Sequence, residues 1–194
     1  MFKIVGNAPR GVPFRRTLMI MDLPQRKLQR LRNYNYAQNG MYFVTLCTQN
    51  RLNLFGQIEN GDLVLNDAGK MVFHKFEQIP QVYPDIAIDK FIVMPNHLHA
   101  ILMIQHDVIQ QGDSGTPRGA FPTMSLSDYI HRFKTLTTKL YIDGVRNGNY
   151  PPFDKKIWQK SYHEHIIRNE QDYQKIWDYI DTNPLKWQDD KYFT

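Results

Sequence analysis

The sequence has very little cysteine, no long apolar run and no internal repeat. Its single cysteine, Cys47, cannot form an internal disulfide, and one cysteine excludes a cysteine-rich zinc site. No stretch reaches the roughly 18 apolar residues that a membrane-spanning helix needs. Residues 1–16 carry arginine and proline where a secretory signal peptide would have its apolar part. We therefore expect a cytoplasmic protein with no membrane partner.

Acidic residues are scarce in the N-terminal part of the chain. Residues 1–40 contain eight Lys or Arg and one acid, Asp22, whereas the rest contains sixteen basic and eighteen acidic residues. The net charge of +5 therefore comes from the N-terminal part, and it favours a polyanionic partner. We predict a basic, phosphate-contacting arm over 1–27 and a single domain over 28–194, although a solvated leader explains the charge equally well. The tightest basic cluster consists of Arg26, Lys27, Arg30 and Arg32.

The remaining sequence alternates between strand and helix patterns. β-Branched and aromatic runs, Asn-Gly turns and helical spacing of apolar residues mark the elements. Their irregular alternation favours an α+β fold, a ferredoxin-like sandwich in which helices cover a mainly antiparallel sheet. Strands are expected over 41–48, on both sides of Asn60-Gly61, on both sides of Pro95-Asn96 and over 157–168, and helices over 66–82, 127–142 and from 169 to near Pro184.

Two finer expectations concern the middle of the chain. Residues 105–124 are rich in Gly, Pro, Asp and Ser, which is typical of a weakly ordered or functional loop. The helix after this loop is expected to stop at Gly144, because glycine commonly ends helices. Its buried stripe is expected to contain Ile130, Phe133, Leu136 and Leu140.

Two histidines stand at the start of a strongly apolar predicted strand. Side chains alternate along a strand, so His97 and His99 should point to one side and Leu98 to the other. Two imidazoles that converge in this way can bind Mn²⁺, Zn²⁺ or Fe²⁺, whereas Mg²⁺ would need more oxygen ligands. Such pairs also occur as ordinary hydrogen-bonded surface histidines, so the pattern alone leaves both interpretations open.

The last predicted helix carries a tyrosine and an asparagine one turn apart. Tyr179 lies on the flank of the apolar stripe, and Asn183 follows four residues later on the same side. They could present a phenol hydroxyl and an amide oxygen to one site. Alternatively, Tyr179 is a half-buried packing residue and Asn183 is a helix cap. The apolar stripe consists of Tyr173, Ile176, Trp177 and Ile180.

These motifs together resemble a known family. PNHLH before an apolar strand, followed later by IWQKSYHEHIIRNEQDYQKIWDYIDTNPLKW, is similar to the single-tyrosine class of HUH transposases, where U is a hydrophobic residue. The likeness is greatest to the REP-associated tyrosine transposases. The stretch NYNYAQNGMYFVTLCTQNRLNLFG resembles the start of such domains, so the resemblance covers about residues 28–188.

The resemblance implies a function and a set of site residues. His97 and His99 would bind a divalent metal, Mg²⁺ or Mn²⁺, and Asn183 would complete the metal site. Tyr179 would be the nucleophile of an endonuclease and strand-transferase that acts on single-stranded or hairpin DNA through a 5′-phosphotyrosine intermediate. Members of the class can share the catalytic helix between two subunits, so a homodimer is one expectation. A bacterial, nucleoid-associated location is another.

Further polar and aromatic residues have weaker interpretations. Lys134, Lys139 and Arg168 are candidates for a single-strand groove, with Tyr162 or Trp158 stacking on bases, although a solvated surface and core packing explain them equally well. His163 and His165 alternate before the last helix, where structural or phosphate-facing roles are favoured over metal binding. Two other functions stay open: a domesticated relative that binds nucleic acid without turnover, and a metal phosphohydrolase that uses water instead of Tyr179.

Overall fold

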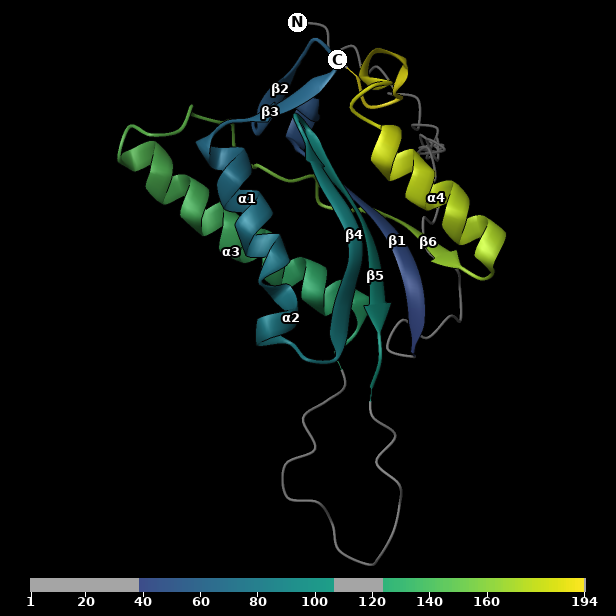
Figure 1. Cartoon of the computed structure of the whole chain (residues 1–194). Helices are drawn as coiled ribbons and strands as arrows, with labels where there is room; N and C mark the ends of the chain where they lie inside the picture. The colour runs from purple at the N-terminus through teal and green to yellow at the C-terminus, as the bar shows by residue number, and fades with distance from the viewer. Residues whose placement is uncertain (1–38, 107–123, 194) are drawn as a thin grey trace, which may run out of the picture.

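The computed structural model describes residues 39–106 and 124–193 (Figure 1). The predicted basic arm, with Arg26, Lys27, Arg30 and Arg32, and most of the predicted loop lie outside the described residues. The elements are β1 (Gly40–Cys47), η1 (Gln49–Arg51), β2 (Gly56–Glu59), β3 (Asp62–Leu65), α1 (Asp67–Glu77), α2 (Ile79–Val82), β4 (Ile86–Met94), β5 (His97–Ile104), α3 (Leu126–Arg146), β6 (His163–Ile167), α4 (Glu170–Thr182) and η2 (Trp187–Asp189).

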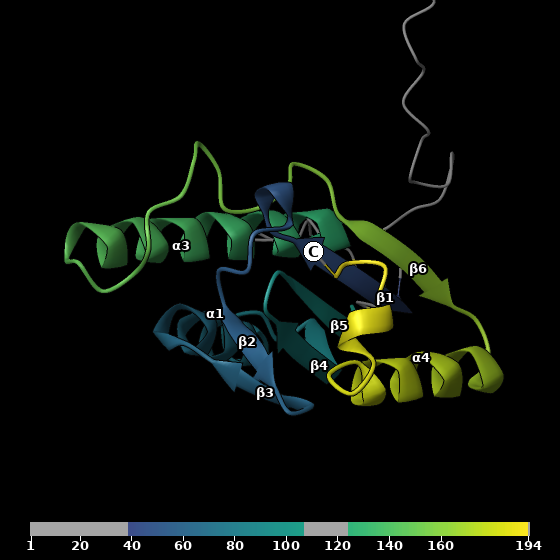
Figure 2. The same cartoon turned by 90° about the horizontal axis from the view of Figure 1, so that it is seen from above.

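The central sheet has four strands in the order β4-β5-β1-β6, and every neighbouring pair is antiparallel. Helices α1 and α3 cover one face of this sheet, and α4 covers the other (Figure 2). The strand order is that of a ferredoxin-like sandwich, with the β2–β3 hairpin inserted after β1. The predicted α+β fold is therefore confirmed.

Alternation along β1 and β5 divides the two faces chemically. Tyr42, Val44 and Leu46 of β1 are fully buried in the apolar core, which also contains Leu98 and Ala100 of β5 and side chains of α1 and α3. The residues between them, including Thr45 of β1 and both histidines of β5, point to the α4 face. The α4 face of the sheet therefore carries the polar groups.

The β2–β3 hairpin and the first helical segment follow from local sequence. Asn60 and Gly61 form the predicted turn with φ of 53° and 88°, the positive values that two-residue hairpin turns require. The predicted helix over 66–82 is two helices that separate at Gln78, because Pro80, in the first turn of α2, has no N–H for a continuous helical ladder. A single long helix was therefore a wrong prediction.

Helix α3 also differs from expectation. It continues to Arg146 and contains Gly144. A Cβ atom at position 144 would overlap the Tyr150 ring, which explains why the residue there is glycine. Gly144 therefore allows close packing and does not end the helix. Leu136 was predicted in the buried stripe but is 45% exposed, and Thr137 is buried in its place. The Thr137 hydroxyl donates to the Phe133 carbonyl and accepts from Trp158 Nε1. Both hydrogen bonds compensate for burying this polar side chain.

The predicted strand over 157–168 is shorter in the structure. Only His163–Ile167 forms β6, and Trp158 makes an isolated bridge to Thr48. Within residues 39–106 and 124–193, no helix combines the length and apolar character needed to cross a membrane.

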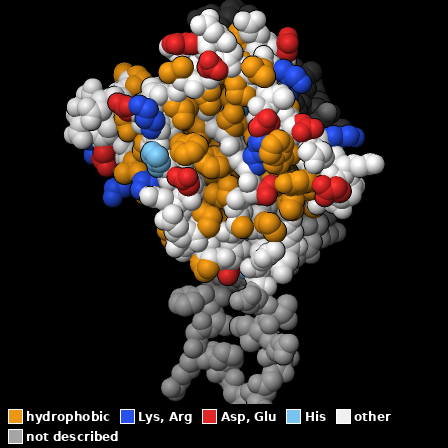
Figure 3. All heavy atoms as spheres, in the orientation of Figure 1, with side chains coloured by type: hydrophobic (Ala, Val, Ile, Leu, Met, Phe, Trp, Pro, Cys, Tyr) orange, Lys and Arg blue, Asp and Glu red, His pale blue; other side chains and the backbone are white. Residues whose placement is uncertain are grey.

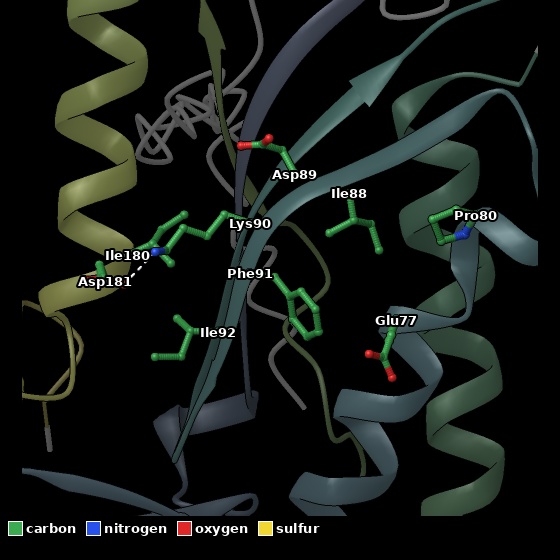
Figure 4. Close-up of a pocket in the computed structure, with 9 residues that line it drawn as sticks. All are labelled: Glu77, Pro80, Ile88, Asp89, Lys90, Phe91, Ile92, Ile180 and Asp181. Carbon is green, nitrogen blue, oxygen red and sulfur yellow. Dashed lines mark hydrogen bonds and ion pairs between the residues drawn. The ribbon is translucent and has the colours of Figure 1, made fainter.

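Strand β4 is an edge strand whose open side is hollowed (Figure 4). Apolar side chains gather over this face of the molecule (Figure 3). The hollow is lined from the α1–α2 side by Glu77 and Pro80 and from α4 by Ile180 and Asp181. Lys90 lies inside it, bonds Asp181 at 2.5 Å and places its ammonium 3.1 Å from the centre of the Trp177 ring. A charged residue and an irregular register near Lys90 protect this edge from pairing with another strand.

Candidate active site

His97 and His99 open strand β5 directly after the Pro95-Asn96 turn. Both side chains are fully buried, and their ring centroids lie 4.3 Å apart. The prediction that they project to one side is confirmed, because both rings contact Tyr192 while Leu98 lies in the opposite core. The strand alternation thus brings two imidazoles into one small volume.

Each histidine is oriented through its Nδ1 atom. His97 Nδ1 lies 2.8 Å from Asn96 Oδ1, and His99 Nδ1 lies 2.8 Å from Thr45 Oγ1. The two Nε2 atoms are therefore left for other partners. His97 Nε2 is buried and has no hydrogen-bond partner among the described residues, whereas His99 Nε2 lies 3.2 Å from the Tyr179 hydroxyl.

Helix α4 brings Tyr179 and Asn183 to the histidines. The Asn169 side chain caps the helix by accepting from the Asp172 amide, and Pro184 follows the C-cap. Tyr179 is partly buried, and its ring centroid lies 5.1 Å from that of His99. Asn183 is buried, and its Oδ1 atom has no hydrogen-bond partner within the described part of the chain. The structure therefore assembles all four residues singled out from the motifs, within one chain.

Asp190 is a further member of this site. Its Oδ2 atom accepts hydrogen bonds from the Tyr179 hydroxyl at 3.0 Å and from Asn183 Nδ2 at 2.6 Å, and its Oδ1 atom accepts from the Tyr192 amide at 2.7 Å. One ligand atom from each of Asp190, His97 and His99 lies within 4.8 Å of the others. The sequence carries no signal for Asp190, which follows the short 3-10 helix η2 outside any recognisable motif.

The C-terminal segment around Asp190 covers the histidines. Tyr192 is buried and places its ring centroid 4.7 Å from His97 and 5.6 Å from His99. Trp187 packs 5.8 Å from His97 on the same side. Lys191 lies 4.9 Å from the centre of the Tyr192 ring. The histidines are therefore shielded from solvent, and the Lys191 ammonium lies over the ring that covers them.

Burial controls the protonation of these groups. It lowers the pKa of His97 to about 3 and holds the pKa of His99 well below its usual value, with the neighbouring His97 adding to the effect. Both imidazoles are therefore neutral, the form that binds metals. Burial, followed by the Asp190 carboxylate, raises the pKa of Tyr179. The phenol thus keeps its proton in this arrangement.

The donor set fits a divalent cation. Two neutral imidazole nitrogens and a carboxylate oxygen, one from each of His97, His99 and Asp190, form a mixed set that can hold a divalent cation. Buried polar atoms without partners are rare in folded proteins, yet His97 Nε2 and Asn183 Oδ1 both lack one among the described residues. A cation held by His97, His99 and Asp190 would satisfy the first of these atoms.

The predicted basic groove residues lie apart from this centre. Lys134 of α3 is half-buried and donates to the carbonyls of Gln159 and Ser161 at 3.0 and 3.1 Å. Lys139 and Arg168 are exposed, on α3 and directly after β6. Lys134 and Lys139 lie on α3, which covers the opposite face of the sheet from the histidines. Arg168 follows the end of β6 that pairs with Met41, whereas His97 pairs with Cys47 at the other end of β1. The structure therefore does not bring these three residues together with the histidines.

The other aromatic and histidine candidates lie in different surroundings, some in the core and some at the surface. Trp158 is buried in the core and cannot stack on bases, whereas Tyr162 is partly exposed and lies 5.7 Å below the Lys134 ammonium. His163 is exposed and pairs with Thr45 on the site face, with its ring 6.4 Å from Tyr192. His165 bonds Asp172 at 2.7 Å, which ties β6 to the start of α4.

Comparisons with known proteins identify relatives of this chain. No family model matches it. An uncharacterised protein of Haemophilus influenzae is 37% identical over 176 residues, which cover 87% of this chain and 93% of the relative. The REP-associated tyrosine transposase of Escherichia coli is 25% identical over 152 residues, which cover 78% of this chain and 70% of the relative.

A solved structure agrees with the second relative. A REP-associated tyrosine transposase bound to a REP hairpin superposes with a TM-score of 0.52 and 25% identity, covering 82% of this chain and 74% of that chain. The sequence motifs, the ferredoxin-like sheet and these matches agree. In sequence and in fold, the chain is therefore similar to the REP-associated tyrosine transposases.

Proposed function

We propose that this protein is a metal-dependent endonuclease and strand-transferase that cuts and rejoins single-stranded DNA, with Tyr179 as the nucleophile. The observation that carries the proposal is the position of the Tyr179 hydroxyl, 3.2 Å from Nε2 of the buried, neutral His99. A module that only binds DNA needs neither a buried histidine pair nor a phenol beside it.

His97, His99 and Asn183 are the residues that we propose for the metal, with Asp190 able to add an oxygen. When bound, Mn²⁺ or Mg²⁺ would offset charge on the non-bridging phosphate oxygens and orient the phosphate for in-line attack. The Asn96 and Thr45 side chains hold the two imidazoles in place before the substrate arrives.

Tyr179 would form a bond from its phenol oxygen to phosphorus while the bond to the 3′ oxygen breaks. The phenol loses one proton and the released 3′ oxygen gains one, so the step is balanced. The 5′-phosphotyrosine link preserves the energy of the phosphodiester, and another 3′-hydroxyl can reverse the step without ATP. Asp190 and Tyr192 lie against Tyr179 and the histidines, so we propose that the C-terminal segment moves aside when DNA enters the site.

Hairpin DNA is the substrate class that we propose. The support comes from the solved relative, which is bound to a REP hairpin. Exposed Lys139 and Arg168, the ammonium of Lys134, and the N-terminal Arg26, Lys27, Arg30 and Arg32 are proposed phosphate contacts. Since the Lys134 ammonium already donates to two carbonyls, Lys134 should contribute least of these residues to the affinity for DNA.

The test is a covalent-capture assay with single-stranded hairpin DNAs labelled at the 3′ end, because a 5′-phosphotyrosine retains the downstream strand. The full chain is incubated with Mn²⁺, with Mg²⁺ or without metal, and the products are separated under denaturing conditions. We expect a metal-dependent labelled protein band that Tyr179→Phe abolishes. Tyr173→Phe is the matched control, because that hydroxyl lies on the same helix but bonds Asp89.

Two other outcomes separate the competing functions. Cleavage without a protein band that persists in Tyr179→Phe would identify a phosphohydrolase that uses water. Hairpins that are retarded on a native gel but never cut would identify a binding protein, and the proposal would be wrong in both cases.

A further inference from the structure

Asn96 is a fully buried polar residue to which the proposed chemistry assigns no step. Its amide nitrogen donates to the Tyr192 carbonyl at 2.8 Å and to the Arg51 carbonyl at 3.2 Å. The main-chain carbonyl of Asn96 accepts hydrogen bonds from the Thr48 amide and hydroxyl. Asn96 therefore joins the β4–β5 turn to the end of β1 and to the C-terminal segment.

These bonds determine which atom faces His97. Both amide hydrogens of Asn96 are directed at carbonyl oxygens, so the atom 2.8 Å from His97 Nδ1 is Oδ1, which can only accept. His97 must then carry its proton on Nδ1, because a neutral imidazole donates from one nitrogen and accepts at the other. The lone pair of His97 Nε2 is left pointing into the site, in agreement with its lack of a partner among the described residues.

His99 has the opposite tautomer, with its hydrogen on Nε2. Asp190 receives three donors, from Tyr179, Asn183 and the Tyr192 amide, and acts as an acceptor throughout. The single hydroxyl hydrogen of Tyr179 is therefore directed at Asp190. The 3.2 Å contact between Tyr179 and His99 Nε2 then requires the hydrogen to sit on Nε2, and Nδ1 accepts from Thr45.

We propose that Asn96 is a positioning residue that holds His97 in the Nδ1–H tautomer, ready to bind a metal through Nε2, while Tyr179 holds His99 in the Nε2–H tautomer. The two imidazoles of the closed site are thus unequal. His97 is a preformed ligand, whereas His99 becomes one only after it changes tautomer and leaves the Tyr179 oxygen. The metal part of this inference rests on the proposed function, but the tautomers do not.

The test is long-range ¹H–¹⁵N correlation spectroscopy of the metal-free full chain, which reports the tautomer of each histidine. We expect Nδ1–H at His97 and Nε2–H at His99 in the unmodified protein. An Nε2–H form at His97, or the same tautomer at both residues, would overturn the proposal without any variant. Exposed His163 is the internal control, because no hydrogen bond within residues 39–106 and 124–193 joins it to an Asn side chain.

Variants of Asn96 distinguish a role as hydrogen-bond acceptor for His97 from a role in packing alone. Asn96→Asp keeps an acceptor oxygen beside Nδ1 and should keep the His97 tautomer, whereas the similar-sized Asn96→Leu should lose it. Tyr179→Phe removes the oxygen that His99 Nε2–H faces, so His99 should switch to Nδ1–H and donate to Thr45. If His97 keeps its Nδ1–H form in Asn96→Leu, the acceptor oxygen of Asn96 does not hold the tautomer and the proposal is wrong.

Mn²⁺ titration of the same proteins without DNA gives a second measure. Loss of a group that orients a metal-binding histidine typically weakens binding about 10- to 100-fold, so Asn96→Leu should weaken Mn²⁺ binding by that order and Asn96→Asp by much less. Tyr179→Phe should bind Mn²⁺ more tightly than the unmodified protein. If the tautomers are as expected but no protein binds Mn²⁺, the positioning of His97 stands and the metal-dependent function fails.

Discussion

Tyr192 packs its ring 4.7 Å from His97 and, on the same side of the sheet, closes a small buried cluster with Cys47, Met94 and Trp187. Cys47 is directly opposite His97 in the β1–β5 ladder. The thiol and the histidine pair therefore share one cover, so the accessibility of Cys47 reports whether that cover is in place.

We predict that Cys47 reacts slowly with thiol reagents in the folded protein. It is 4% exposed, and burial raises its pKa to about 11, so the reactive thiolate is scarce at pH 8. The labelling rate should be at least about tenfold lower than in urea-unfolded protein. Tyr192→Ala should increase the rate, whereas Leu185→Ala, at a 75% exposed position, should not. Equal rates in both variants would show that Tyr192 does not cover the thiol.

Mn²⁺ should stabilise the protein against thermal unfolding. A ligand that binds only the native state adds about 2.7 kcal/mol at a concentration 100 times its Kd, which is a shift in Tm of roughly 5–10 °C for a domain of this size. His97→Gln should abolish the shift, because it removes the buried Nε2 atom. His163→Gln, at an exposed position beyond Thr45, should retain it. Equal shifts in the two variants would place the metal elsewhere.

Gly144→Ala should destabilise the protein although alanine favours helices. The propensity gain is about 1 kcal/mol, but the new methyl group would overlap the Tyr150 ring, and overpacking typically costs about 1–3 kcal/mol. Subtracting the gain from the cost, we expect the free energy of unfolding in urea to fall by up to about 2 kcal/mol. Thr135→Ala, at an exposed site on the same helix, should change it by less than about 0.5 kcal/mol. A more stable Gly144→Ala protein would mean that Tyr150 moves aside freely.

Lys90 should contribute more to the docking of α4 than its ion-pair partner does. Its side chain is 16% exposed and contacts both Asp181 and the Trp177 ring, whereas Asp181 is 57% exposed. We expect Lys90→Ala to lower the free energy of unfolding by about 1–2 kcal/mol and Asp181→Ala by less than about 1 kcal/mol. A double-mutant cycle in urea measures both. Equal losses would assign the stabilisation to the ion pair instead of the ring contact.

The sequence predicted those parts of the site that obey a regular period. Strand alternation placed His97 and His99 on one side, and helical spacing placed Tyr179 and Asn183 together, because both periods hold whatever surrounds the element. The roles proposed for these four residues came from the family resemblance. The antiparallel sheet followed from the order of the elements and their turn residues.

What could not be predicted depends on contacts between distant segments. Asp190 and Tyr192 lie beyond the last long helix, and only the fold shows that they return to the histidines. Gly144 carries the signature of a helix end, but the Tyr150 ring decides its role. Leu136 fits the helical stripe, yet the buried position belongs to Thr137, whose hydroxyl finds partners in Phe133 and Trp158.

The histidines are two residues apart, but their partners are far away along the chain. Thr45 is separated from His99 by 54 positions and Tyr179 by 80. Contacts of such separation form late, after the entropy of closing long loops has been overcome. The histidine pair can therefore appear early in the β4–β5 hairpin, while its oriented, buried form exists only once β1 and α4 have packed beside it. Metal affinity would then be a property of the completed fold, and a nascent or partly unfolded chain would carry the motif without the activity.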